Sequence, residues 1–133
     1  MPGSFLDTNV LVYLAQSDTG KAERVEQLLG LEPVVSVQVL NELANVLRRK
    51  AAFSWSETRR FLTIVRDLAR VIPLTMEAHD LGLAIAERYT LSLYDAMIVA
   101  AAQTSECNVL WSEDMQHGLR LENGLEIRNP FRG

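Results

Sequence analysis

The chain has 133 residues and a mass of 14.9 kDa, which suits one domain, residues 1–133, with its own hydrophobic core. Apolar residues make up 48% and charged residues 23%, values that exclude a disordered chain and a collagen-like repeat. The longest uninterrupted apolar run, residues 96–102, has seven residues, whereas a membrane span needs about 18. The first residues also lack the basic start and apolar stretch of a signal peptide. We therefore expect a cytoplasmic protein that does not cross a membrane.

The charges are distributed unevenly along the chain. The net charge is −4, but residues 48–70 carry seven basic and two acidic residues, so this segment has +5 and the other 110 residues have −9. Such polarity permits an acidic site beside a basic flank, although a solvated helix face explains the same charges. The single cysteine, Cys107, cannot close a disulfide within the chain, and we expect it in the core.

Short apolar runs alternate with stretches of helical periodicity, a pattern typical of an α/β protein with a parallel sheet. The pattern predicts strands at residues 4–6, 34–37, 71–72, 109–111 and 125–127. It predicts helices at residues 10–15, 21–29, 39–50, 55–70, 76–89 and 93–102. The last of these is apolar all round and should lie in the middle of the structure. Ser54 and Glu57 have the spacing of a capping box at the start of the fourth helix.

Four acidic residues lie at positions that suit a catalytic or metal-binding site better than an exposed surface. Asp7 and Asp114 follow strands, Asp95 lies in the first turn of the apolar helix, and Glu42 flanks the buried face of helix 39–50. Sites in open α/β sheets lie beyond the carboxyl ends of the strands, where four such carboxylates would repel one another. Oxygen ligands of this kind suit Mg²⁺ or Mn²⁺. Each residue also has a plain alternative, since three of them could be helix caps and Glu42 ordinary helix surface.

Several phrases of the sequence together resemble those of a known family. They are Phe5-Leu6-Asp7-Thr8-Asn9-Val10-Leu11, Leu40-Asn41-Glu42-Leu43, Ser92-Leu93-Tyr94-Asp95-Ala96, Leu110-Trp111-Ser112-Glu113-Asp114-Met115-Gln116-His117-Gly118 and the closing Asn129-Pro130-Phe131. In their order and spacing they are similar to PIN-domain ribonucleases, specifically to VapC-type toxins of type II toxin-antitoxin systems. The resemblance covers nearly the whole chain.

The resemblance implies a three-layer α/β/α sandwich around a parallel sheet of about five strands. It implies Mg²⁺-dependent endoribonuclease activity, with Mn²⁺ able to substitute, and RNA as the substrate. The catalytic and metal-binding residues would be the acidic quartet, which we define as Asp7, Glu42, Asp95 and Asp114. It also implies a cognate antitoxin that covers the active site, and a homodimer.

Three residues are candidates for supporting the quartet. Thr8, Asn9 and Ser112 could orient water or a phosphate oxygen, or could simply satisfy nearby main-chain groups at a turn. Ser112 stands where the family often has threonine, and it keeps the hydroxyl. The expected reaction is in-line attack of an activated water on a phosphodiester, which leaves 5′-phosphate and 3′-hydroxyl ends. Basic side chains near the crevice could hold RNA, with Arg48, Arg49, Arg59 and Arg60 as the candidates.

Other functions remain open at this point. A catalytically inactive PIN-like binding module would keep the fold without the chemistry. Phosphoryl transfer through an aspartyl-phosphate would fit Asp7 after a strand, but that pattern wants a second aspartate where the chain has Asn9. Metal-free acid-base catalysis would need His79 or His117, and neither has an obvious partner in the sequence.

Overall fold

A five-stranded parallel sheet forms the centre of the molecule. In the computed structural model, which describes residues 3–16 and 19–132, the strand order is β3-β2-β1-β4-β5. The strands are β1 (Gly3–Leu6), β2 (Val34–Ser36), β3 (Arg70–Ile72), β4 (Cys107–Trp111) and β5 (Glu126–Arg128). All neighbouring strands pair in parallel. The predicted parallel sheet is therefore confirmed.

Strand β1 occupies the middle of the sheet, and Phe5 and Leu6 give it one apolar side chain on each face. Phe5 pairs with Val34 of β2 on one side and with Leu110 of β4 on the other. Phe5 and Leu6 are fully buried, as expected for a parallel strand covered on both faces. Cys107, in β4, is buried as predicted.

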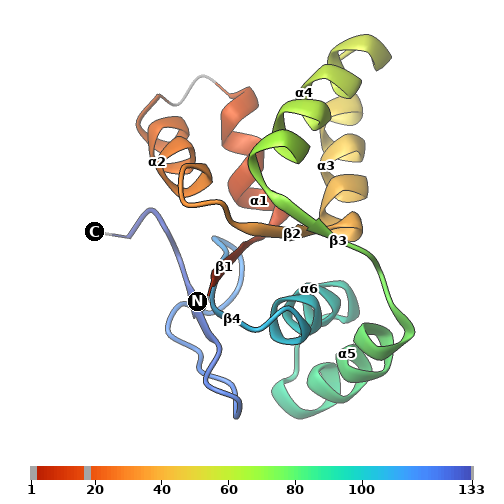
Figure 1. Cartoon of the computed structure of the whole chain (residues 1–133), viewed down its shortest axis with the longest axis vertical. Coiled ribbons are helices and arrows are strands. Elements are labelled where there is room, and N and C mark those ends of the chain that lie inside the picture. The colour runs from red at the N-terminus through yellow and green to blue at the C-terminus, as the bar shows by residue number, and fades with distance from the viewer. Residues whose placement is uncertain (1–2, 17–18, 133) are drawn as a thin grey trace.

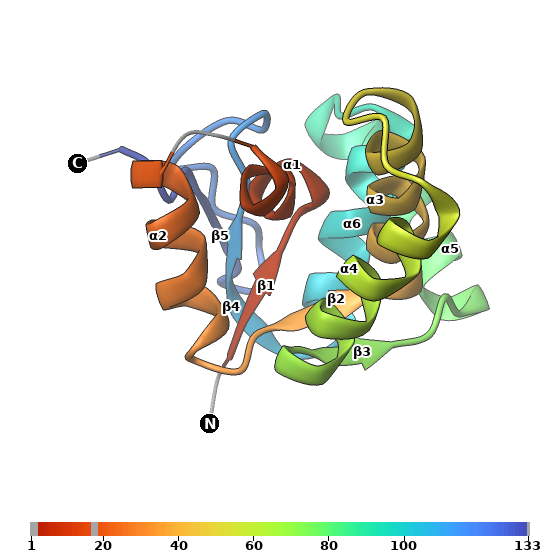
Figure 2. The same cartoon turned by 90° about the horizontal axis from the view of Figure 1, so that it is seen from above.

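Helices cover both faces of the sheet and make the predicted three layers (Figure 1). One face carries α1 (Thr8–Leu11), the 3-10 helix η1 (Val12–Ala15), α2 (Thr19–Leu29), α3 (Val37–Arg49) and α4 (Trp55–Leu68). The other face carries α5 (Met76–Tyr89) and α6 (Leu93–Thr104), which pack on each other, as Figure 2 shows from above. Six of the 12 residues of helix α6 are buried, in agreement with its apolar composition. It approaches α5 closely at Gly82, where an added Cβ would lie 2.6 Å from the Met97 sulfur.

The chain changes direction across the sheet between β1 and β4. From β1 it moves outward through β2 to β3, and it then returns to the opposite side of β1 as β4. Such a reversal opens a crevice between the carboxyl ends of the two central strands. The residues that follow β1 and β4, Asp7 and Ser112, therefore lie at the place where this topology builds a site.

Element boundaries differ from the sequence expectation by a few residues. Helix α3 begins at Val37, two residues earlier than predicted, because Ser36 caps it by accepting a hydrogen bond from the Val39 main chain. The predicted helix 10–15 begins at Thr8 and is split into α1 and η1. The capping box of Ser54 and Glu57 is confirmed. Within the described residues, no helix is long and apolar enough to cross a membrane.

Candidate active site: an acidic cleft

A cleft of about 590 Å³ lies at the carboxyl ends of β1 and β4. All four members of the acidic quartet line it, and they come from four separate segments of the chain. The walls also include Thr8, Asn9 and Tyr13 from α1 and η1, Asn45, Val46 and Lys50 from α3 and the turn after it, and Glu113 after β4. We call this cavity the acidic cleft. The quartet was expected in one crevice, and the fold brings its members there.

Asp7 is the most enclosed member of the quartet, with 4% of its surface exposed. Its Oδ1 accepts from the Thr8 main-chain N–H at 2.7 Å, and its Oδ2 accepts from the Ser112 hydroxyl at 2.8 Å and the Asn9 amide at 3.1 Å. Burial raises the pKa of Asp7 from 3.8 to about 6, hydrogen bonds from Ser112 and Thr8 oppose this rise, and the charges of Asp95 and Glu42 add to it. Burial thus outweighs the donors around this carboxylate.

Asp95 and Glu42 reach the cleft from two helices. Asp95 lies in the first turn of α6, where its main-chain N–H donates to the capping Ser92 hydroxyl. Burial raises the pKa of Asp95, Ser92 opposes the rise, and the charges of Asp114 and Glu42 add to it. Glu42, in α3, accepts from the Thr8 hydroxyl at 3.1 Å and from the Gln38 amide at 2.9 Å. The helix-cap explanation of Asp95 is therefore compatible with a place in the cleft.

The predicted supporting residues connect β1 to β4 through Asp7. Ser112 is fully buried; its hydroxyl donates to Asp7 and accepts from the Met115 main chain at 3.3 Å. Asn9 donates to Asp7 and Ser112, and its Oδ1 accepts from the Glu113 main chain at 3.0 Å. Both residues thus hold the acid and satisfy the local main chain. The sequence allowed either a role in orienting the site or a role in satisfying main-chain groups at a turn, and these side chains have both kinds of contact.

The chemistry of the cleft suits a hard divalent cation. Its ligands would be carboxylate oxygens, and no member of the quartet forms an ion pair with lysine or arginine in the part of the chain that the structure describes. Burial raises the pKa values of Asp7 and Asp95, and repulsion by neighbouring carboxylates adds to the rise; a bound cation would relieve this repulsion. Within residues 3–16 and 19–132, however, no three His, Cys, Asp or Glu side chains are gathered to hold a metal ion. A bound cation would have to draw the side chains together.

The four arginines singled out as RNA contacts do not line the acidic cleft. Arg48 donates to the Phe53 carbonyl at 2.6 Å and stacks over the Trp55 ring, 4.2 Å from its centroid. Arg49, Arg59 and Arg60 are exposed on α3 and α4. All four are exposed, and none forms part of the walls of the cleft.

Lys50 was overlooked in the sequence analysis, yet it lines the cleft. The periodicity of α3 could have identified it. Positions 45, 46 and 50 lie three, four and eight residues after position 42, so the four positions share one face of a helix. All four line the cleft. Neither His79 nor His117 lines it, and the His117 Nδ1 accepts from the Asn129 main chain at 2.9 Å.

A family model confirms the resemblance seen in the motifs. The PIN-domain model matches residues 4–118, and the chain belongs to the PIN-domain family. No curated protein sequence matches it.

Solved structures share the fold at low sequence identity. A toxin-antitoxin complex from Klebsiella pneumoniae is 17% identical with a TM-score of 0.75, over 96% of this chain and 98% of that one. The DNA-bound VapBC of Salmonella typhimurium is 20% identical with a TM-score of 0.69, over 98% and 99%. VapC20 of Mycobacterium tuberculosis, a toxin that cleaves the sarcin-ricin loop, is 17% identical with a TM-score of 0.63, over 84% and 89%. These likenesses establish the three-layer fold.

Proposed function

We propose that this protein is a Mg²⁺-dependent endoribonuclease that acts as the toxin of a toxin-antitoxin pair. One observation carries the proposal: four carboxylates from separate segments line a single cleft at the topological switch point, and none is neutralised by a lysine or arginine among the described residues. Membership of the PIN-domain family and the likeness to VapC20 support ribonuclease chemistry. Mn²⁺ should substitute for Mg²⁺ because both prefer oxygen ligands.

In the proposed mechanism, the acidic quartet would hold one or two divalent cations, and these would stabilise the negative charge that develops at the reacting phosphate. Asp7 is held in place by Ser112, Asn9 and the Thr8 main chain, so its orientation is set before substrate arrives. Thr8 orients Glu42 through its hydroxyl. Water attacks the phosphorus in line and loses a proton to solvent as the bond from phosphorus to the 3′-oxygen breaks. The leaving 3′-oxygen takes up a proton, so the products carry 5′-phosphate and 3′-hydroxyl ends.

Lys50 has the charge to contact RNA at the cleft itself. It is exposed and shares the cleft with the quartet, so its ammonium group can reach a phosphate that the carboxylates would otherwise repel. Arg48, Arg49, Arg59 and Arg60 would hold more distant phosphates of the same strand.

We further propose a cognate antitoxin as partner, a homodimeric assembly and a cytoplasmic location. Among the structural relatives are toxin-antitoxin complexes from Klebsiella pneumoniae and Salmonella typhimurium. On α4, Trp55, Ile64 and Leu68 have 59%, 52% and 46% of their surfaces exposed, and exposed apolar side chains of this kind suit contact with another protein.

The decisive experiment uses the purified chain free of any partner. It is incubated with total cellular RNA in the presence of Mg²⁺ or of EDTA, and the new 5′ ends are sequenced. We expect discrete cleavage sites with Mg²⁺ that disappear with EDTA and with the Asp95→Asn variant. Equal cleavage by wild type and Asp95→Asn would refute the proposal.

A catalytically inactive PIN-like binding module is the alternative. Such a protein has no chemical reason to keep four unneutralised acids in one cleft. It predicts no RNA cleavage under any metal condition and no Mn²⁺ binding that depends on the quartet, so titration with Mn²⁺ distinguishes the two functions.

A further inference from the structure

Glu113 differs from the other acidic residues of the cleft. It lies between Ser112 and Asp114 in the sequence and lines the same cavity. From its residue type and position alone, it would count as a fifth metal ligand. Of the five acidic side chains that line the cleft, Glu113 is the one with an ion-pair partner in the described part of the chain. That partner is Lys21, a residue of α2.

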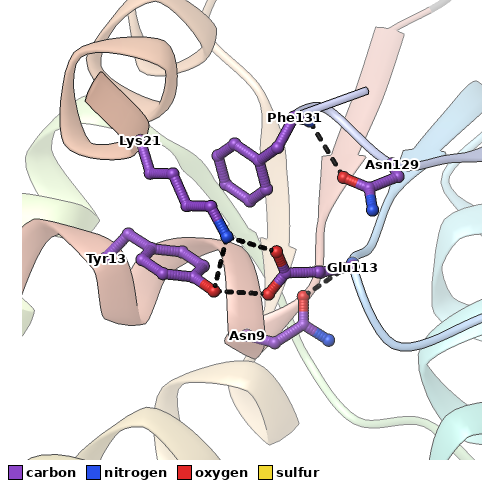
Figure 3. Close-up of polar contacts among 6 residues, drawn as sticks. All are labelled: Asn9, Tyr13, Lys21, Glu113, Asn129 and Phe131. Atoms are coloured by element: carbon purple, nitrogen blue, oxygen red, sulfur yellow. Dashed lines mark hydrogen bonds and ion pairs between the residues drawn. The ribbon is translucent and has the colours of Figure 1, made fainter. Parts of the chain in front are cut away.

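Tyr13 and Lys21 engage both carboxylate oxygens of Glu113 (Figure 3). Oε2 accepts from the Lys21 ammonium group at 2.8 Å, and Oε1 accepts from the Tyr13 hydroxyl. Lys21 also donates to the Tyr13 hydroxyl at 3.1 Å. The three side chains therefore form a closed triangle of charge-assisted contacts.

Aromatic rings hold the lysine of this triangle. Its Nζ lies 4.5 Å from the Tyr13 ring centroid and 5.0 Å from that of Phe131, and these two rings pack edge to face at 5.0 Å. Asn129 accepts from the Phe131 main chain at 2.9 Å and so fixes the turn that carries the ring. The side chains of Lys21 and Glu113 are 33% and 25% exposed. The ion pair is thus partly shielded from solvent. The rings of Tyr13 and Phe131, from two other segments of the chain, pack against its lysine.

We propose that Lys21, with Tyr13, is a positioning residue that holds Glu113 out of the metal-ligand set. This inference rests on the proposed metal-dependent function. Lys21 neutralises the fifth carboxylate at the rim of the cleft, so the negative charge offered to a cation is that of the quartet. The Glu113 main chain meanwhile donates to Asn9, which holds Asp7. Of the two consecutive acids, Asp114 lines the cleft and the Glu113 carboxylate contacts Lys21 of α2.

The test is Mn²⁺ binding to the purified, metal-free protein, with Mn²⁺ alone as the probe. Lys21→Met keeps the aliphatic stem against the rings and removes the charge. It should tighten Mn²⁺ binding about threefold to tenfold, because the positive charge of Lys21 no longer offsets the Glu113 carboxylate beside the quartet. Glu113→Gln alone should stay within about twofold of wild type, and adding it to Lys21→Met should cancel the gain.

Two outcomes would overturn the inference. Weaker Mn²⁺ binding in Glu113→Gln by about tenfold or more would make Glu113 a ligand in the wild type. Unchanged or weaker binding in Lys21→Met would show that the lysine does not control the charge of the cleft.

A second measurement in EDTA separates failure of this inference from failure of the proposed function. Lys21→Met should lower the melting temperature by about 3–5 °C. Glu113→Gln on that background should raise it again, because it removes the negative charge that Lys21 offsets in the wild type. If wild type binds no Mn²⁺, the proposed metal-dependent function fails, and this thermal cycle alone decides the role of Lys21. If Glu113→Gln lowers the melting temperature further on that background, Lys21 does not act by neutralising Glu113.

Discussion

Asp7 should make the metal-free protein less stable at neutral pH than at pH 4. Its carboxyl is 4% exposed, and burial raises its pKa from 3.8 to about 6. One pKa unit corresponds to about 1.4 kcal/mol, so the ionised Asp7 costs the folded state about 3 kcal/mol relative to the unfolded chain. This penalty is a sizeable part of the roughly 5–15 kcal/mol that stabilises a typical domain.

The sign follows from proton binding. Between pH 3.8 and about 6 the folded protein holds a proton on Asp7 that the unfolded chain has released. The contribution of Asp7 to the free energy of unfolding therefore falls as the pH rises through this window. Above about pH 7 both states are ionised, and the contribution of Asp7 stays constant at its least favourable value.

Urea unfolding in EDTA between pH 4 and 7.5 measures this effect, with Asp7→Asn as the comparison. Asparagine does not titrate, so the free energy of unfolding of the variant minus that of wild type should increase by about 2.5 kcal/mol between pH 4 and 7.5. Altered hydrogen bonds to Ser112 and Asn9 shift this difference by a constant amount and leave its slope. Glu57→Gln is a matched control of opposite sign, because main-chain and side-chain hydrogen bonds of Ser54 lower the pKa of Glu57. A flat difference for Asp7→Asn, or one that falls with pH, would show that the surrounding donors outweigh burial.

Three further predictions concern the proposed site. Asp95→Asn should abolish Mg²⁺-dependent RNA cleavage and leave the melting temperature in EDTA equal or higher, because it removes a carboxylate whose pKa is raised by burial and by neighbouring charges; a lower melting temperature would contradict this. Mg²⁺ or Mn²⁺ should raise the melting temperature of wild type with the logarithm of concentration and leave Asp7→Asn unchanged, and equal responses would place the metal elsewhere. Lys50→Glu should raise the KM for RNA. The double variant Arg59→Glu with Arg60→Glu should reduce the slope of log binding constant against log salt concentration by about 0.7 for each lost phosphate contact. If the double variant keeps its RNA affinity but loses a protein partner, that face binds the partner.

The core of the site was predictable because it depends on local pattern and topology. Phe5 and Leu6 form an apolar run directly before Asp7, and β-branched residues mark β2. The alternation of such strand patterns with helical patterns predicts a parallel sheet, and Asp7 then lies at the end of a strand. The amphipathic period of α3 places Glu42 beside the buried face. Ser92 gives the start of α6 and hence the turn that carries Asp95.

The remainder depends on contacts between distant segments, which periodicity does not encode. Lys21 meets Glu113 across 92 positions of the chain, and the sequence around Lys21 predicts only a helix. After β4, Met115, Leu121 and Leu125 are buried without forming a regular element until β5. The predicted last strand was therefore displaced by one residue, because apolar content marks what is buried and not which residues pair.

The two interpretations of Asp7, as a helix cap and as a catalytic acid, are not exclusive. Its Oδ1 caps α1 through the Thr8 main chain, while its Oδ2 receives Ser112 and Asn9. The cap fixes the rotamer, and the other two donors fix the plane of the carboxyl group, so the acid is oriented by the fold alone. These donors recover only part of the cost of burying the carboxyl, because its pKa is still raised. A residue kept for the cap alone would lie nearer the surface and avoid that cost. The burial of Asp7 therefore favours a function beyond helix capping, and the trade of stability for a preorganised acid is typical of an active site.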